Sequence, residues 1–218
     1  MMLPESMMLP EQMALFEVPG PAGLKILRGF ALDVACDVIA AVERVAAAAP
    51  FRRMQVPGGG TMSVAMTNCG AAGWTADTNG YRYSPADPVS GYPWPAMPEI
   101  IFNLAGRAAE AADFRSFAPD ACLINRYEPG ARMGLHQDRD EKDRDAPIVS
   151  LSLGLPATFL FGGLRRRDPQ ARIDLRHGDV VVWGEAVRLA YHGVAPLQDG
   201  THEILGRQRL NLTLRKAL

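Results

Sequence analysis

The chain has 218 residues, which is enough for a single domain with a sizeable hydrophobic core. Its 23 Lys and Arg residues nearly balance its 24 Asp and Glu residues, and the net charge of −1 argues against a strongly basic nucleic-acid packaging protein. A nucleic-acid enzyme is still compatible with this balance, because such an enzyme needs only a local positive patch.

The remaining composition favours a protein of the cytoplasm. No apolar stretch is long enough to span a membrane, so we expect no membrane partner. The three cysteines are isolated and form no C-x-x-C pair, which argues against a disulfide framework or a zinc ribbon. The first basic residue is Lys25, so we expect no charged targeting peptide. Nothing indicates oligomerisation, and we expect a monomer.

Two helices are predicted in the first half of the chain, after a flexible Met-rich tail over residues 1–23. Residues 33–49 carry valines at helical spacing, and Pro50 stops the helix. A second helix is expected over residues 98–112, with a buried apolar stripe. The segment between them, residues 51–97, is rich in Gly, Pro, Met and aromatic residues and shows little regular periodicity.

From residue 119 onward the pattern changes to strands. Strands are predicted within residues 122–127, 148–161, 173–183 and 208–215. Short strands separated by Gly and Pro turns, after amino-terminal helices, favour a β-sandwich or jelly roll. We therefore predict a mostly β fold with flanking α-helices, in which residues 24–218 form a single domain.

Two histidines and one aspartate in this region are candidate metal ligands. His136 and Asp138 are two residues apart, so on an extended strand both side chains would leave the same face. His192 follows much later and would complete the set through the fold. Two imidazoles and one carboxylate form the facial triad that leaves open positions on iron(II).

The last predicted strand carries two arginines on its polar face. In RLNLTLR the leucines alternate with Arg209, Asn211, Thr213 and Arg215. A guanidinium group matches the geometry of a carboxylate, so two arginines beside a metal suit a dicarboxylate co-substrate. Taken singly, an H-x-D pair and one distant histidine are weak signals.

Several longer strings carry more specific information. They are FRRMQVPGG, TMSVAMTNCGAAGWT, YSPADPVSGYPWPAMP, PDACLINRYEPGARMGLHQDRDE, APIVSLSLGLPATFLFGG, HGDVVVWG, YHGV and RLNLTLR. In this order and spacing the chain closely resembles the bacterial AlkB proteins, from about residue 24 to the carboxyl end. That family comprises iron(II)- and 2-oxoglutarate-dependent dioxygenases that reverse alkylation damage in nucleic acids.

The resemblance implies a double-stranded β-helix core, a jelly-roll and cupin-like arrangement, over residues 119–218. It implies that His136, Asp138 and His192 hold Fe(II), and that 2-oxoglutarate and O2 are co-substrates. Arg209 would pair with the distal carboxylate of 2-oxoglutarate. The 2-oxoglutarate contacts that it implies are Asn125, Tyr127, Arg209, Asn211 and Arg215.

The implied reaction is oxidative dealkylation of N-methylated bases of the 1-methyladenine and 3-methylcytosine type. The substrate would be single- or double-stranded DNA, with RNA as a further candidate. The reaction would release formaldehyde, succinate and CO2. Because the methyl group lies on a Watson–Crick edge, the base must leave a duplex or come from a single strand.

The resemblance gives residues 51–97 the role of a nucleotide-recognition lid. Trp74 would stack on the base, Met66 would line the lid and Tyr81 would contact a phosphate. Asp140 would face the base, where a carboxylate favours a cationic methylated form, and Arg166 would contact a phosphate. From the residues alone, Trp74 and Met66 also suit a core, Asp140 suits a solvated charged loop, and Arg166 suits a solvated turn.

Two other functions are weighed against the nucleic-acid dealkylase. An iron(II)- and 2-oxoglutarate-dependent hydroxylase of a protein side chain or small metabolite would keep the same centre, but the lid strings disfavour it. A non-enzymatic cupin-like binding module or metal sensor would need no open coordination positions and no paired arginines.

Overall fold

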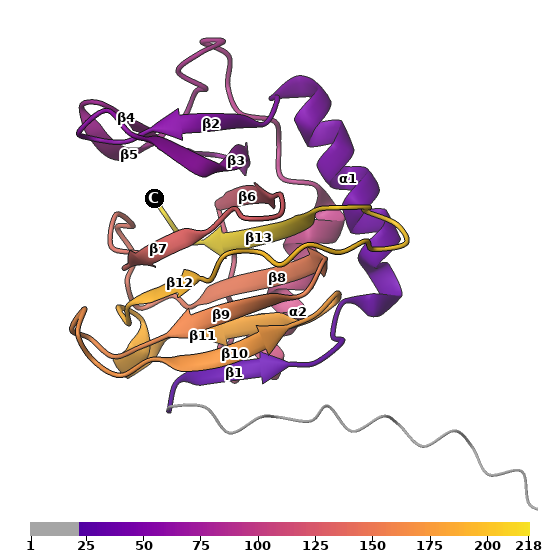
Figure 1. The fold of residues 1–218 in the computed structure, drawn as a ribbon, viewed down its shortest axis with the longest axis vertical. Helices are drawn as coiled ribbons and strands as arrows, with labels where there is room; N and C mark the ends of the chain where they lie inside the picture. The colour runs from indigo at the N-terminus through magenta and orange to yellow at the C-terminus, as the bar shows by residue number, and fades with distance from the viewer. Residues whose placement is uncertain (1–21) are drawn as a thin grey trace, which may run out of the picture.

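A computed structural model describes residues 22–218, in which thirteen antiparallel strands form two large sheets and one hairpin (Figure 1). The seven-stranded major sheet has the order β1 (Leu24–Leu27), β11 (Val180–Trp183), β8 (Ile148–Gly154), β13 (Arg209–Arg215), β6 (Ala121–Tyr127), β3 (Thr61–Gly70) and β2 (Arg52–Gln55). The four-stranded minor sheet has the order β10 (Ala171–Leu175), β9 (Ala157–Phe161), β12 (His192–Val194) and β7 (Met133–His136). A separate hairpin pairs β4 (Gly73–Asp77) with β5 (Gly80–Ser84).

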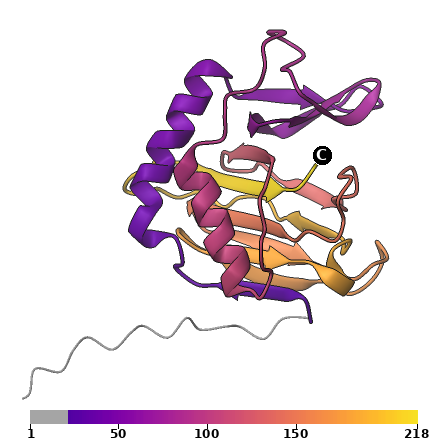
Figure 2. The same cartoon turned by 180° about the vertical axis from the view of Figure 1, so that it is seen from behind.

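Two helices cover one face of the major sheet (Figure 2). They are α1 (Ala35–Ala48) and α2 (Glu99–Ala111). Two short 3-10 helices are also present: η1 (Leu32–Val34) directly precedes α1, and η2 (Glu185–Val187) follows β11. Val38, Val42 and Val45 repeat at helical spacing and are buried against the sheet. The predicted helices over 33–49 and 98–112 are therefore confirmed within two residues at each end.

The opposite face of the major sheet packs against the minor sheet. A second buried cluster joins the two sheets through residues such as Tyr127 and Trp183 from the major sheet and Phe159 from the minor one. In β13 the leucines lie on the helix side, whereas Arg209 and Arg215 line a pocket between the sheets. The predicted polar and apolar faces of this strand are confirmed, and the fold is mostly β with flanking helices.

The prediction of one extended segment over 148–161 differs from the structure. The chain turns at Gly154 and Pro156, so that β8 belongs to the major sheet and β9 to the minor sheet. Gly154 has a φ of +89°, and a Cβ there would lie 2.5 Å from the carbonyl oxygen of Gln208. The turn therefore needs glycine, and it carries the chain from one sheet to the other.

Residues 51–97 contain more regular structure than their sequence indicates. Strands β2 and β3 extend the major sheet, and β3 pairs with β6 along most of its length. Only the β4–β5 hairpin stands apart from the two large sheets. Strand β1 also joins the major sheet, so strands that precede residue 119 contribute to the sandwich.

The expected tail over residues 1–23 lies, except for its last two residues, outside the described part of the chain. Among residues 22–218, no helix combines the length and the apolar composition that crossing a membrane requires.

Candidate active site

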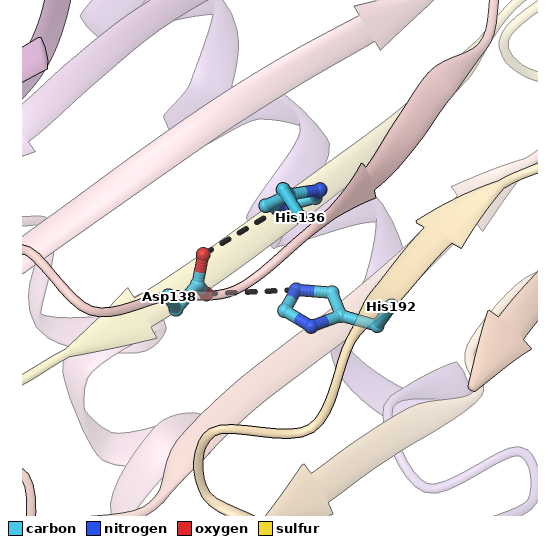
Figure 3. A group of neighbouring side chains, drawn as sticks. All are labelled: His136, Asp138 and His192. Atoms are coloured by element: carbon cyan, nitrogen blue, oxygen red, sulfur yellow. Dashed lines mark ion pairs between the residues drawn. The ribbon is translucent and has the colours of Figure 1, made fainter. Parts of the chain in front are cut away.

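His136, Asp138 and His192 converge at the edge of the minor sheet (Figure 3). His136 ends β7 and lies directly opposite His192, the first residue of β12. The Nε2 atom of His136 lies 3.6 Å from Oδ1 of Asp138, and the Nε2 atom of His192 lies 3.8 Å from Oδ2. All three donor atoms are within 4.8 Å of one another, which suits a single metal ion.

Asp138 does not lie on the same strand as His136, contrary to the prediction from their spacing. Strand β7 ends at His136, and Asp138 follows in the irregular segment after it. The chain runs on from the end of β7, and the carboxylate of Asp138 lies beside the two imidazoles (Figure 3).

Backbone carbonyls orient both imidazoles. Nδ1 of His136 lies 2.9 Å from the carbonyl oxygen of Gly134, and Nδ1 of His192 lies 3.0 Å from that of Ala190. A carbonyl oxygen can only accept, so in the neutral rings each Nδ1 carries the proton and donates it. The lone pairs of both Nε2 atoms are consequently available to a metal.

The electrostatics of the site favour deprotonated ligands. Burial lowers the pKa of His192 to about 4, so this imidazole is neutral at neutral pH. Burial alone would raise the pKa of Asp138, but Arg215 and the two imidazoles hold it below its ordinary value. Nε and Nη2 of Arg215 donate to Oδ2 of Asp138 over 2.8 and 2.6 Å.

The pocket beside the triad lies between the two sheets and has a cationic floor. Arg209 is 1% exposed, and its Nη2 atom donates to Oγ of Ser152 over 2.9 Å. Its Nε and Nη1 atoms have no hydrogen-bond partner among the described residues, and neither has Oδ1 of Asn125. Buried polar groups are normally paired, so these atoms indicate a polar ligand in the pocket.

The five predicted 2-oxoglutarate contacts all line this pocket, together with His136 and His192. They are Asn125, Tyr127, Arg209, Asn211 and Arg215. The side chain of Asn211 is held by Ser150, Asn125 and Thr213, which fixes the polar wall between the two arginines. Three metal donors beside a guanidinium with two unpaired nitrogens fit an iron(II) ion and a dicarboxylate.

The predicted nucleic-acid contacts lie in three different environments. Trp74 and Tyr81 stack on each other in the β4–β5 hairpin, with ring centroids 5.5 Å apart. Nε1 of Trp74 donates to Oδ2 of Asp140 over 3.1 Å, so the hairpin meets the segment after Asp138. Met66 is 1% exposed and packs in the inter-sheet core, whereas Arg166 lies after β9 with its guanidinium 5.9 Å from the ring of Tyr191.

Glu141, Tyr83 and Arg188 belong to the site but were not predicted from the sequence. Glu141 follows Asp140 in a highly charged run, yet it is 4% exposed. Tyr83 donates to Oε1 of Glu141 over 2.7 Å, and Arg188 donates to the carbonyl oxygen of Asp138 over 2.8 Å. No local pattern distinguishes Glu141 from its charged neighbours; only the fold brings its partners together.

Comparisons with known proteins agree with this geometry. The model of the 2OG-Fe(II) oxygenase superfamily matches residues 23–215. The chain is 57% identical to the alpha-ketoglutarate-dependent dioxygenase AlkB of Escherichia coli K12 over 202 residues, covering 93% of this chain and 94% of that protein. It is 43% identical to the AlkB homolog of Caulobacter vibrioides NA1000 over 189 residues, covering 85% and 84% of the two chains.

A solved structure supports the same assignment. The structure of OsALKBH1 superposes with a TM-score of 0.81 at 29% identity, covering 92% of this chain and 99% of that one. Sequence and fold therefore agree along most of the length of the compared chains. The chain belongs to the 2OG-Fe(II) oxygenase superfamily and, within it, to the AlkB dioxygenases.

Proposed function

We propose that this dioxygenase removes methyl groups from the ring nitrogens of damaged bases in DNA, of the 1-methyladenine and 3-methylcytosine type. The observation that carries the proposal is the hydrogen bond between Trp74 and Asp140. Asp140 lies two residues after the metal ligand Asp138, so this hydrogen bond places both side chains near the metal site. An aromatic ring and a carboxylate beside an oxidising centre suit a flat, cationic substrate. The match to a murine protein named nucleic acid dioxygenase, 32% identical over 118 residues and covering 54% of this chain and 30% of that protein, supports the same substrate class.

The residues of the pocket have distinct roles in the proposed reaction. His136, Asp138 and His192 hold iron(II), and Arg209 at the pocket floor binds the distal carboxylate of 2-oxoglutarate. Asn125, Tyr127 and Asn211 complete the polar wall, and Arg215 keeps Asp138 ionised. With 2-oxoglutarate and O2, iron(II) supplies the oxidation that hydroxylates the methyl group and releases formaldehyde, succinate and CO2.

The β4–β5 hairpin and its neighbours position the base. Trp74 stacks on the flipped base, which contributes roughly 1–3 kcal/mol per base. Asp140 favours a methylated base because that base is cationic, whereas the undamaged base is neutral. Tyr81 and Arg166 contact the phosphate backbone, and Met66, on β3, lines the lid.

The finer features of the family complete the proposal. The sandwich of two sheets is the double-stranded β-helix, residues 51–97 form the nucleotide-recognition lid, and residues 24–218 act as one domain. The protein works as a monomer on single- or double-stranded DNA, with RNA as a further substrate. Cys36, Cys69 and Cys122 form no disulfide, which is consistent with a reducing cytoplasm.

Mass spectrometry of a single-stranded oligomer with one 3-methylcytosine tests the proposal. The oligomer is incubated with the protein, iron(II), ascorbate, O2 and 2-oxoglutarate, and succinate is measured in parallel. We expect the oligomer to lose the mass of one methylene group, only when 2-oxoglutarate is present. His136→Ala removes a metal ligand and should abolish both products. Succinate with an unchanged oligomer would instead indicate a hydroxylase of a protein side chain or metabolite.

A further inference from the structure

Glu141 is a buried carboxylate that lies between the hairpin and the metal site. Its side chain is 2% exposed although it follows the exposed residue Asp140. Oε1 accepts a hydrogen bond from the hydroxyl of Tyr83 over 2.7 Å. Oε1 also lies 3.3 Å from Nε of Arg215, and Oε2 lies 3.3 Å from Nη2 of Arg188. Both oxygens are therefore used, by partners from three segments of the chain.

The two arginines connect Glu141 to Asp138. Arg215 places Nε on both carboxylates, 2.8 Å from Oδ2 of Asp138 and 3.3 Å from Oε1 of Glu141. Arg188 donates to Oε2 of Glu141 and to the backbone carbonyl of Asp138. Asp138 is thus held at its side chain by Arg215 and at its backbone by Arg188, and both arginines also contact Glu141.

Tyr83 connects the same carboxylate to the hairpin. Tyr83 lies on β5, directly opposite Trp74 on β4. Burial raises the pKa of Tyr83, so its hydroxyl stays protonated and donates to Glu141. A continuous chain of polar contacts therefore runs from the pair of strands that carries Trp74 to the ligand Asp138.

We propose that Glu141 is a positioning residue that couples the order of the β4–β5 hairpin to the geometry of the metal ligand Asp138. This inference rests on the proposed function, since it assigns the hairpin to the substrate and Asp138 to the metal. Binding of the metal fixes the side chains of Asp138 and Arg215. Glu141 contacts both Arg215 and Tyr83, so its position and that of Tyr83 become fixed as well. The hairpin is then held more firmly for the base when the metal is bound than when it is absent.

The charges of the cluster explain why Glu141 matters to the metal. Asp138 and Glu141 supply two negative charges, and Arg188 and Arg215 supply two positive charges. Without the charge of Glu141, Arg188 loses its carboxylate partner and Arg215 keeps only the carboxylate of Asp138. Arg215 already donates to Oδ2 of Asp138, so it then competes more strongly with the metal for this oxygen. Removing a hydrogen-bonded support of a metal ligand typically weakens metal affinity by about tenfold or more.

Metal titration of two variants tests the first half of the inference. Manganese(II) is titrated calorimetrically into the wild-type protein, Glu141→Gln and Tyr83→Phe without 2-oxoglutarate. We expect Glu141→Gln to raise the Kd for the metal by about tenfold. Tyr83→Phe leaves the arginines paired and should change the Kd by less than about twofold. An unchanged Kd in Glu141→Gln would overturn the inference.

Hydrogen exchange of the hairpin amides, residues 73–84, tests the second half. In the wild-type protein, manganese(II) should slow exchange in the hairpin, and both Glu141→Gln and Tyr83→Phe should lose most of this effect at saturating metal. Tyr92→Phe changes an exposed tyrosine in the loop after β5 and should behave as the wild type. If Tyr83→Phe retains the full metal-induced protection, the coupling through Glu141 is refuted, even where Glu141→Gln proves too unstable to study.

Failure of the inference and failure of the proposed function give different results. The two tests above need no substrate and no turnover. A wild-type protein that leaves 3-methylcytosine unchanged but shows metal-dependent protection of the hairpin would contradict the function alone. A protein that demethylates the oligomer but shows no such protection would contradict the coupling alone.

Discussion

Arg209 combines complete burial with incomplete hydrogen bonding. Only its Nη2 atom donates to a side chain, Ser152, while Nε and Nη1 lack partners among the described residues. Burial lowers the pKa of its guanidinium, whose carbon lies 5.1 Å from the centroid of the Tyr127 ring. A buried cation with unpaired donors destabilises a fold, so we expect Arg209 to serve the binding of a ligand rather than stability.

The variant Arg209→Met should separate stability from function. Methionine fills similar space without a charge, so the free energy of unfolding of the ligand-free protein should stay the same or rise, by up to about 2 kcal/mol. The KM for 2-oxoglutarate should rise about thirtyfold or more, because a buried ion pair with its carboxylate is lost. Urea unfolding without ligands and succinate kinetics measure the two effects.

Arg207→Met is the matched control for this prediction. Arg207 lies two residues earlier, is exposed, and pairs with Asp199 at the surface, where ion pairs contribute little. Neither its unfolding free energy nor its KM should change appreciably. A destabilised Arg209→Met that keeps the wild-type KM would show that Arg209 is structural.

At the scale of single elements, the sequence predicts best where one face is apolar and the other is polar. Strand β13 alternates leucines with polar residues, and α1 repeats valines at helical spacing before Pro50. Strand β3 was not predicted because it is buried on both faces and contains Thr67 and Asn68 among its buried residues. A strand with polar residues in its core lacks the alternation that sequence reasoning uses.

The candidate site follows the same rule. Residue types predict the triad, although Asp138 lies in the segment after β7 and not on the strand that its spacing predicts, and the alternation in RLNLTLR predicts the polar face of β13. The resemblance to a family added Trp74 and Asp140. Glu141 could not be predicted, because its burial depends on Tyr83, Arg188 and Arg215, which come from three distant segments.

The β4–β5 hairpin is attached to the sandwich at its base by Asn68. This side chain is fully buried in β3, donates to the carbonyl oxygen of Trp74 over 3.1 Å and accepts from its N–H over 3.0 Å. Gly73 packs against Trp94, where a Cβ would lie 2.5 Å from the indole. The backbone of Trp74 is therefore fixed on both sides.

We expect Asn68→Ala to loosen Trp74 without damaging the metal site. Two backbone groups of Trp74 lose their partner, which costs about 1–3 kcal/mol in the folded hairpin. Demethylation of the oligomer should fall several-fold, while succinate formation without oligomer stays close to the wild-type rate. Asn79→Ala, at the exposed turn of the same hairpin, should leave both rates unchanged. Equal loss of both activities in Asn68→Ala would place the defect at the iron centre instead.

At the scale of the whole molecule, the active site lies where the two sheets face each other. His136 and His192 come from the minor sheet, whereas Arg209, Asn211 and Asn125 come from the major sheet. A metal bound to the histidines and a dicarboxylate bound to Arg209 would therefore meet across the sandwich. Ligands that bind only the folded state stabilise it, and this stabilisation grows with the logarithm of the ligand concentration divided by its Kd.

Metal and 2-oxoglutarate together should consequently stabilise the protein more than the sum of their separate effects. At a hundredfold excess over its Kd, manganese(II) should add about 2.7 kcal/mol to the free energy of unfolding. Alone, 2-oxoglutarate should add little, because only Arg209 and its polar neighbours hold it; with the metal present its contribution should become comparable to that of the metal. Urea unfolding without ligand, with each ligand and with both measures this coupling. In Arg209→Met the metal should still stabilise the fold, and the added effect of 2-oxoglutarate should vanish. If 2-oxoglutarate stabilises the wild-type protein equally with and without metal, the two ligands do not meet in this pocket.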